Sequence, residues 1–264
     1  MKPIVFIKLG GSLITDKEIP YHARRSVIQS LAFQLQEIIA EKKELSFIVG
    51  NGAGSFGHCP AKEYQVASGA DTDQKIFGFC KVQHSVATLN RIVMDQLVKD
   101  GVHALSIHPS SIMVSDKGVP HMFAESIFGI LNLGILPVVY GDIVYDSSYG
   151  CKIFSTEDIF SILIKTCIQK HISVYSTVHL GIVDGVLDEN GRVIKRITHS
   201  NYPSIQKNLF TPKGYDVTGG MKHKIEQSLA ISKYGIQTCI INGLTKHNLK
   251  TFLLKGICTG TAIY

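Results

Sequence analysis

The nine residues GNGAGSFGH at 50–58 contain four glycines and end in a histidine. Glycine has no Cβ and tolerates positive φ, so successive backbone N–H groups can converge on one ligand. The usual ligand of such a backbone is a phosphate, although a flexible surface turn has a similar composition. The imidazole of His58 adds a side chain able to donate a hydrogen bond to an anion. The stretch is therefore a candidate phosphate site.

A second Gly-rich segment, KLGGS at 8–12, follows the apolar run that begins the chain. A lysine in an apolar strand is expensive to bury without an anion, which favours a phosphate role for Lys8. Gly10 and Gly11 offer a second phosphate-sized nest beside it. Neither segment has the GxxxxGK[ST] spacing of a P-loop or the GxGxxG spacing of a dinucleotide site.

A third segment, DVTGGMKHKIEQS at 216–228, places two glycines before an expected helix whose first turns carry Lys222 and Lys224. A helix N-terminus disfavours lysines unless an anion lies nearby, the alternative being a solvated helix start. Phosphoryl transfer needs cations around the transferred group and a rigid backbone to hold it, with little covalent chemistry. Lys8, Lys224 and the two Gly-rich segments would meet that need.

Short β-branched runs alternate with segments of helical periodicity, which predicts a mostly parallel sheet covered on both faces. The expected strands are 3–10, 45–50, 103–108, 136–146, 171–177 and 237–243, and the expected helices are 24–43, 81–101, 157–170 and 221–235. Ligands of such sheets bind beyond the carboxyl ends of the strands, where the Gly-rich segments fall. We find no internal repeat or linker, so one domain, or two lobes sharing a continuous sheet, is expected.

Composition excludes several classes of protein. The chain has 264 residues, 45% hydrophobic content and a net charge of +6 without a block of basic residues, so neither disorder nor a nucleic-acid surface is indicated. No apolar run is long enough to span a membrane, and the start MKPIVFIKLGG does not read as a signal peptide. The six cysteines show no CxxC spacing, so we expect reduced thiols, no zinc site and a cytoplasmic location.

The segments KLGGS, GAGSFGH, YGDIVYD, FSTEDI and DVTGGMKHK together resemble the amino acid kinase family. KLGGSLITDK, GSFGH, SIHPSS and DVTGGMK are similar to the patterns of its isopentenyl phosphate kinases, and the resemblance spans positions 5 to about 243. It implies an α/β fold, an open αβα sandwich with a mostly parallel central sheet, in a homodimer that uses ATP and Mg²⁺. It also implies one domain over 1–264, with an acceptor lobe at about 1–170 and a nucleotide lobe at about 171–264.

The resemblance assigns roles residue by residue. The catalytic set is Lys8, Lys17, His58, Asp158 and Lys224. The ATP-binding set is Lys8, Gly10, Gly11, Ser12, Gly54, Asp184, Gly219, Lys222 and Lys224. The set for a small phosphorylated acceptor is Gly52, Ala53, Gly54, His58 and Thr156. Asp158 should orient Lys8 and its lysine partner, and Mg²⁺ should enter with ATP and not at a metal site of the protein's own.

Three segments depart from the subgroup's patterns. Asn51-Gly52-Ala53-Gly54 stands in place of His-Gly-Gly-Gly, and residues 155–158 read Ser-Thr-Glu-Asp in place of Ser-Gly-Asp-Asp. Residues 177–185, interpreted as the nucleotide loop, are longer than Thr-Asp-Val-Asp-Gly and lack one acid. Ala53 is compatible with a phosphate loop only if its φ stays negative.

The implied reaction is transfer of a phosphoryl group from ATP to isopentenyl phosphate, giving isopentenyl diphosphate. Two alternatives remain: a kinase of another phosphorylated or phosphonate acceptor, as in the fosfomycin kinases that share the FGH histidine, and a non-catalytic nucleotide-binding protein. An apolar slot for a prenyl tail would separate the first two. Phe77, Phe79, Val82 and Val86 could line such a slot or be ordinary core residues.

Overall fold

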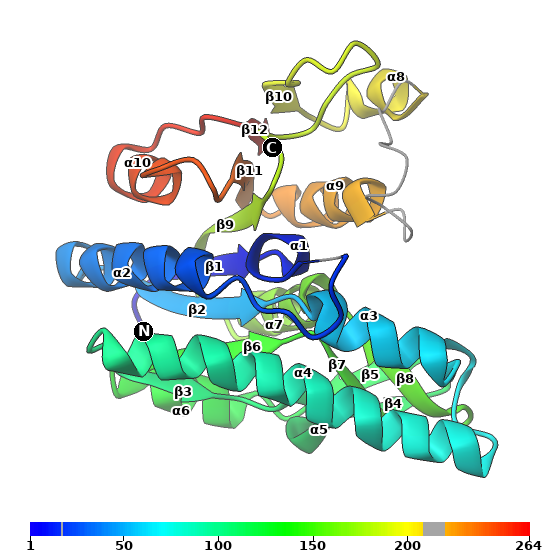
Figure 1. Ribbon diagram of the computed structural model, residues 1–264. Coiled ribbons are helices and arrows are strands. Elements are labelled where there is room, and N and C mark those ends of the chain that lie inside the picture. The colour runs from blue at the N-terminus through cyan, green and yellow to red at the C-terminus, as the bar shows by residue number, and fades with distance from the viewer. Residues whose placement is uncertain (17, 208–219) are drawn as a thin grey trace.

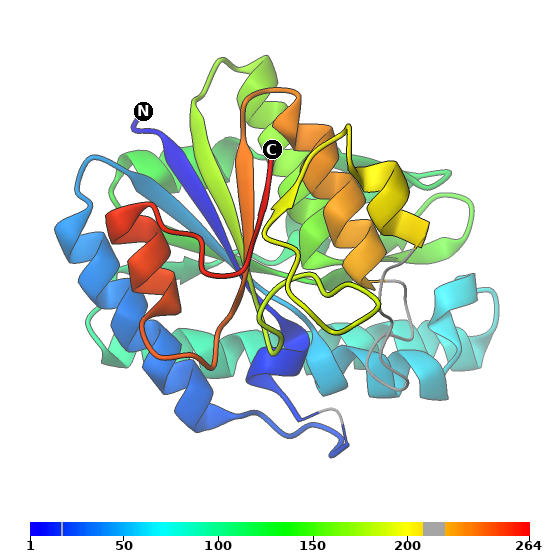
Figure 2. The same ribbon diagram turned by 90° about the horizontal axis from the view of Figure 1, so that it is seen from above.

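A largely parallel sheet, built from both halves of the chain, forms the centre of the molecule (Figures 1 and 2). The computed structural model describes residues 1–16, 18–207 and 220–264, and within these ranges the sheet has eight strands in the order β10-β12-β11-β9-β1-β2-β6-β3. The strands are β1 Ile4–Leu9, β2 Ser46–Asn51, β3 Ala104–Ser106, β6 Leu136–Tyr140, β9 Val174–Gly181, β10 Arg196–Ile197, β11 Gln237–Asn242 and β12 Thr261–Ile263. Because β9, β1, β2 and β6 are parallel neighbours, their carboxyl ends lie at one edge of the sheet.

Helices cover both faces of this sheet. One face packs against α1 Gly11–Ile14, α2 Arg25–Glu41, α3 Gly54–Glu63, α4 Asp73–Lys99 and α10 Asn248–Lys255, and the other against α6 Glu125–Asn132, α7 Thr156–Gln169 and α9 Gly220–Ser232. Figure 2 shows α2 and α10 on one side of the strands and α9 on the other. Among the helices of the described ranges, none combines the length and apolar content that crossing a membrane requires.

A smaller sheet lies beside the N-terminal half of α4, away from β9 and β11 (Figure 1). In the part of the chain that the structure describes it has four strands in the order β5-β4-β7-β8. These strands are β4 Met113–Asp116, β5 Val119–Met122, β7 Asp142–Asp146 and β8 Gly150–Phe154. The remaining short elements are α5 Pro109–Ile112, α8 Tyr202–Lys207 and a 3₁₀ turn at Val66–Ser68.

Side-chain alternation along β1 decides which of its residues reach the site. Val5, Ile7 and Leu9 enter the apolar layer beneath α2 and α4, whereas Ile4 and Phe6 enter the layer beneath α7. Lys8 continues the second series and therefore faces α7. The strand is buried along its whole length, so the ammonium group of Lys8 must find a polar partner where α7 begins.

The expected fold class is confirmed, since the described chain is an α/β, open αβα sandwich with a mostly parallel central sheet. Three elements differ from the sequence expectation. The segment expected as one strand at 136–146 forms two strands, β6 in the large sheet and β7 in the smaller one. The helix expected from 81 begins at Asp73, where Thr72 Oγ1 accepts a hydrogen bond from the N–H of Lys75. The strand expected to end at 177 continues to Gly181, so the first half of the segment 177–185, interpreted as the nucleotide loop, belongs to this strand.

The expectation of six reduced thiols is wrong at two positions. Cys239 and Cys258 form a disulfide with a Cα–Cα distance of 6.1 Å and a sequence separation of 19 residues. Cys239 lies on β11, and Cys258 lies just before β12, the antiparallel neighbour of β11. The pairing follows from the fold and has no local spacing signature, which is why the absence of CxxC did not exclude it.

Alkylation should therefore modify four cysteines per chain in denaturant without reductant and all six after reduction. Cys258→Ser should lower the free energy of unfolding by about 2–4 kcal/mol, because the crosslink restricts the unfolded chain. Mass spectrometry of the alkylated protein and urea unfolding with and without reductant measure both effects. Six modified thiols before reduction would contradict the disulfide.

Candidate active site

The two Gly-rich segments that follow β1 and β2 pack directly against each other. A Cβ added to Gly11 would lie 2.5 Å from the backbone N of Gly54, and one added to Gly52 would lie 2.5 Å from the backbone N of Gly11. Gly54 also has a φ of +51°, which disfavours a side chain. The glycines are thus required by this close approach, and the segments at 10–12 and 52–54 form one continuous backbone surface.

Lys8 ends in a buried ion pair with Glu157. The Lys8 side chain is 7% exposed, and its Nζ donates a hydrogen bond to Oε1 of Glu157, itself 8% exposed. Burial alone would raise the pKa of Glu157, but the positive charges of Lys8 and Lys224 lower it to about 2. Glu157 therefore stays ionised and fixes the ammonium group at the carboxyl end of β1.

The expectation that Asp158 contacts Lys8 does not hold. Asp158 accepts hydrogen bonds from the backbone N–H and the hydroxyl of Ser155 in a capping box that begins α7. Its Oδ1 also accepts from Gln227 at 2.8 Å and lies 3.1 Å from Nε2 of His223, both on α9. Asp158 therefore joins the starts of α7 and α9, while the neighbouring residue Glu157 contacts Lys8.

The first turns of α9 carry the other expected lysines. Lys224 is half-buried and close enough to Glu157 to influence its pKa. Lys222 is exposed, with its Nζ 3.9 Å from Oε1 of Glu226 on the same helix. The structure thus brings Lys224, but not Lys222, toward the buried pair. Gly219 and Lys17, which were also expected here, lie outside the described residues.

His179 belongs to this buried cluster although the sequence analysis did not single it out. It lies opposite Lys8 in the register of β9 and β1, with its side chain on the α7 face. Burial lowers the pKa of His179 to about 3, so the imidazole is neutral at neutral pH. The alternation of Thr177 and His179 with the core residues Val178 and Leu180 was the signal that this segment is a strand.

The neutral state of His179 predicts a pH dependence of stability. Below about pH 6.5 the unfolded chain binds a proton at this imidazole that the folded chain does not, so the free energy of unfolding should fall by about 1.4 kcal/mol per pH unit. Glu157 adds a second loss of the same sign only below about pH 4.5. In urea unfolding between pH 6.5 and 5, His179→Gln should show a shallower slope than wild type. The exposed control His84→Gln should keep the wild-type slope, and an unchanged slope in His179→Gln would contradict the assignment.

A buried polar network holds the carboxyl end of β2, where the segment 52–54 begins. The hydroxyl of Thr156 donates to the carbonyl of Asn51 at 2.7 Å, and Nδ2 of Asn90 donates to Oδ1 of Asn51 at 2.9 Å. Oγ of Ser106 in turn donates to Oδ1 of Asn90 at 2.5 Å. Thr156, expected to contact the acceptor, supports through its hydrogen bond to Asn51 the strand end from which the 52–54 segment departs.

Ala53 and His58, both expected at the acceptor phosphate, lie at the start of α3. Ala53 is the N-cap of α3 with φ −72°, so its methyl group is accommodated at negative φ, as the sequence analysis required. His58 is the fifth residue of the same helix, and its side chain is exposed to solvent, whereas the first turn, Gly54–Phe56, is buried.

Apolar side chains gather behind this helix. Val82 and Val86 of α4 are buried with Tyr140, Ile143 and other residues, and Phe79 packs partly buried against them. We call the set Phe79, Val82, Val86, Tyr140 and Ile143 the tail cluster. Val86 lies close to α3, since a Cβ added to Gly57 of that helix would be 3.3 Å from Cγ1 of Val86. Phe77 does not join, because it is 53% exposed.

The remaining expected nucleotide residues lie at the same edge of the sheet. Gly10 donates its N–H to the carbonyl of Leu180 at 2.9 Å, and Ser12 is half-buried in α1. Asp184 follows β9 and accepts a hydrogen bond at 3.0 Å from Asn242 at the end of β11. These contacts connect the ends of β1, β9 and β11.

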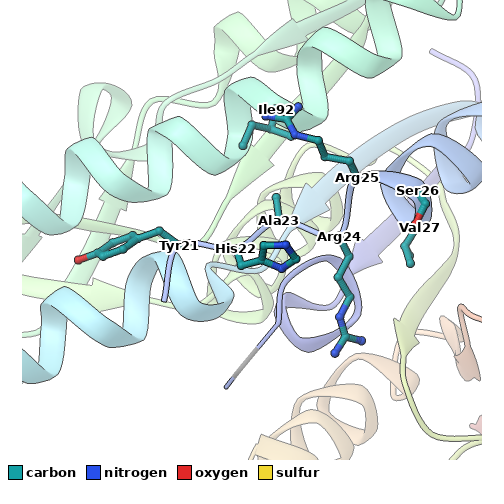
Figure 3. A pocket seen from close by; sticks show the side chains of 8 residues that line it. All are labelled: Tyr21, His22, Ala23, Arg24, Arg25, Ser26, Val27 and Ile92. Atoms are coloured by element: carbon teal, nitrogen blue, oxygen red, sulfur yellow. The ribbon is translucent and has the colours of Figure 1, made fainter. Parts of the chain in front are cut away.

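A concavity of about 530 Å³ opens at the start of α2 (Figure 3). It is lined by residues 21–27 and by Ile92 of α4, and Figure 3 shows the guanidinium groups of Arg24 and Arg25 extending in different directions. None of the residues of the Lys8–Glu157 cluster lines it. The concavity is therefore distinct from the buried ion pair.

The donor set fits a nucleotide whose metal ion travels with it. At Gly10, Gly11, Gly52 and Gly54 an added Cβ would collide with neighbouring protein atoms, so only glycine fits there. The backbone N–H groups of such Gly-rich turns suit phosphate oxygens. Among the described residues no group of three or more His, Cys, Asp or Glu side chains could hold a metal ion.

Two Gly-rich segments in contact, a buried lysine and a helix start that carries Lys224 lie at the carboxyl edge of a parallel sheet, as a phosphoryl-transfer enzyme of the α/β class requires. Residues 3–242 match the model of the amino acid kinase family. The chain belongs to this family and is an ATP-dependent kinase.

Similar proteins cover the chain almost completely. It is 34% identical to the isopentenyl phosphate kinase of Methanocaldococcus jannaschii and 32% identical to that of Methanothermobacter thermautotrophicus, in each case over 98% of both chains. A solved structure described as an isopentenyl phosphate kinase aligns with a TM-score of 0.81 and 26% identity over 99% of this chain and 100% of that one. More distantly, the glutamate 5-kinase of Kosmotoga olearia is 25% identical over 97% of this chain and 67% of its own length.

Proposed function

We propose that the protein transfers the terminal phosphoryl group of ATP to isopentenyl phosphate, giving isopentenyl diphosphate. The observation that carries this proposal is the backbone contact between the two Gly-rich segments, one beside the buried Lys8 and the other leading into the helix of His58. Two phosphates bound at adjoining nests would be close enough to react. The similarity to isopentenyl phosphate kinases supports the same acceptor.

On the donor side, Gly11 and Ser12 would bind the terminal phosphate of ATP through backbone N–H groups, whereas the N–H of Gly10 already donates to Leu180 and Gly10 would only border the phosphate. Lys8 and Lys224 would stabilise the charge that develops on the transferred group, which is the main contribution a protein makes to this chemistry. Glu157 holds the ammonium group of Lys8 in place. Mg²⁺, bound with ATP, would supply further charge neutralisation.

On the acceptor side, the N-terminus of α3 and His58 would bind the phosphate already present on the substrate. The tail cluster would have to open to admit the five-carbon chain, because most of its side chains are buried. At about 0.8 kcal/mol per buried CH₂, the chain would contribute several kcal/mol of binding energy. The two lobes, at about 1–170 and 171–264, would then hold acceptor and nucleotide respectively. We also propose that the protein is a homodimer, as the family resemblance implies.

The test is ADP release in a coupled assay with a panel of acceptors. Isopentenyl phosphate should give the highest kcat/KM, and methyl phosphate, which has the same phosphate without the tail, should be at least about 100-fold poorer because it forfeits that burial energy. Preference for fosfomycin would favour the phosphonate alternative, and preference for glutamate would favour a carboxylate acceptor. Tight ATP binding without turnover of any acceptor would favour a non-catalytic protein.

A further inference from the structure

Thr15 stands between the two Gly-rich segments and touches both. Its side chain is fully buried just after α1. The hydroxyl Oγ1 donates to the carbonyl of Gly11 at 2.7 Å and accepts from the backbone N–H of Ser55 at 3.1 Å. A single hydroxyl thus links the donor segment to the first turn of the acceptor helix.

Helix α3 lacks the usual local cap, which explains why this contact exists. Its N-cap residue is Ala53, which has no side-chain acceptor for the N–H groups of the first turn. Thr15 supplies that acceptor from 40 residues earlier in the chain. The N–H of Ser55 is therefore satisfied by the opposite segment and not by a residue of its own loop.

The end of α1 does not itself need the hydroxyl of Thr15. The backbone N–H of Thr15 already donates to the carbonyl of Gly11 at 2.9 Å, which closes the turn. Gly54 packs onto the hydroxyl so closely that an added Cβ would lie 2.1 Å from Oγ1. The side chain therefore serves the contact between the segments more than the local turn.

We infer that Thr15 is a positioning residue that sets the separation of the donor and acceptor phosphates. The inference rests on the proposed function, in which the segments at 10–12 and 52–54 bind those phosphates. Van der Waals contact between the two backbones limits only their closest approach, whereas the hydrogen bonds through Oγ1 also hold them together and in register. Transfer between two bound groups is sensitive to such alignment, and a shift of about 1 Å can reduce the rate about 100-fold.

Three variants separate positioning from packing. Thr15→Val keeps the shape and loses both hydrogen bonds, and Thr15→Ser keeps the hydroxyl and loses only the methyl group. Thr238→Val is the matched control, because Thr238 is also fully buried and loses one hydroxyl bond, to Thr177 at 2.6 Å, on another part of the sheet. If a buried polar group that has lost its hydrogen-bond partner lowers stability in general, the control should lose stability as well.

We expect Thr15→Val to lower kcat by about 10- to 100-fold. The Kd of a non-hydrolysable ATP analogue and the Kd of isopentenyl phosphate, each measured alone, should change less than about threefold. Thr15→Ser should retain kcat within about threefold of wild type. Thr238→Val should lower the melting temperature and keep kcat. Equal losses in the Ser and Val variants, or normal turnover in Thr15→Val, would overturn the inference.

Hydrogen exchange gives a readout that does not depend on turnover or on the acceptor. The amides of residues 54–57 should exchange at least about tenfold faster in Thr15→Val than in wild type and at the wild-type rate in Thr15→Ser. Unchanged exchange in Thr15→Val overturns the inference whatever the activity. If wild type does not phosphorylate isopentenyl phosphate but the two variants show the expected exchange rates, the proposed acceptor is overturned and the role of Thr15 is supported. Should Thr15→Val fail to fold, Thr15→Ala is used in the same measurements and the same criteria apply to it.

Discussion

Glu157→Gln is expected to lower kcat by about 100- to 1,000-fold, comparable to the loss of a transition-state charge contact. The amide keeps the size of the side chain but removes the negative charge that holds Nζ of Lys8 at the end of β1. The ammonium group would then lose its partner inside a buried cluster, so the melting temperature should also fall. Because ATP phosphates would restore a counter-charge, saturating ATP should raise the melting temperature of this variant more than that of wild type.

Asp158→Asn is the matched control for this prediction. It removes the neighbouring carboxylate, which caps α7 and contacts α9, so it should destabilise by about 1 kcal/mol and reduce kcat less than tenfold. Lys8→Met should reproduce the kcat loss of Glu157→Gln, since both variants remove a correctly placed ammonium group. If Asp158→Asn lowered kcat as far as Glu157→Gln, the assignment of Glu157 as the carboxylate that positions Lys8 would be wrong.

The fold could be predicted from the sequence because its periodicities are strong. The buried run 3–10 and the amphipathic segment 24–43 form β1 and α2 nearly as expected. The α3 helix was not predicted, since Gly54, Gly57 and Pro60 give its sequence a low helical propensity. Its formation depends on tertiary contacts, among them the capping of Ser55 by Thr15 from a distant segment.

The choice between two adjacent carboxylates was the main error in the site. Resemblance placed Asp158 beside Lys8, yet Ser155 and Asp158 have the Ser-x-x-Asp spacing of a capping box, which uses the last residue to close the helix start. Consecutive residues of a helix point about 100° apart, so Asp158 cannot serve the cap and also take the position of Glu157. The capping spacing was readable from the sequence and would have favoured Glu157.

The buried cluster and the disulfide could not be predicted from local patterns. His179 becomes a neighbour of Lys8 only through the register of β9 and β1, and Cys239 meets Cys258 only because β11 and β12 are antiparallel neighbours. Strand register is set by the burial of whole faces and by connections far along the chain. Pairings of this kind therefore emerge only when the sheet is assembled.

His58→Ala is expected to raise the KM for isopentenyl phosphate by about 10- to 100-fold and to change the KM for ATP less than about twofold. His58 is exposed on α3, downstream of the 52–54 segment, where it can donate to a phosphate arriving from solvent. A hydrogen bond to a charged group contributes about 1.5–3 kcal/mol, which corresponds to that change in KM. His58→Gln keeps one donor and should give an intermediate KM.

Steady-state kinetics with each substrate varied in turn distinguish this role from two others. If His58 stabilises the transferred group instead, kcat should fall while the acceptor KM holds, because the lost interaction would then exist only in the transition state. If it is only a packed side chain, both constants should survive and the melting temperature should drop. The control His84→Ala removes an exposed histidine from the neighbouring helix α4 and should leave all three quantities unchanged. An acceptor KM that stays at the wild-type value in His58→Ala would remove the 52–58 segment as the acceptor-phosphate site, whichever acceptor proves best.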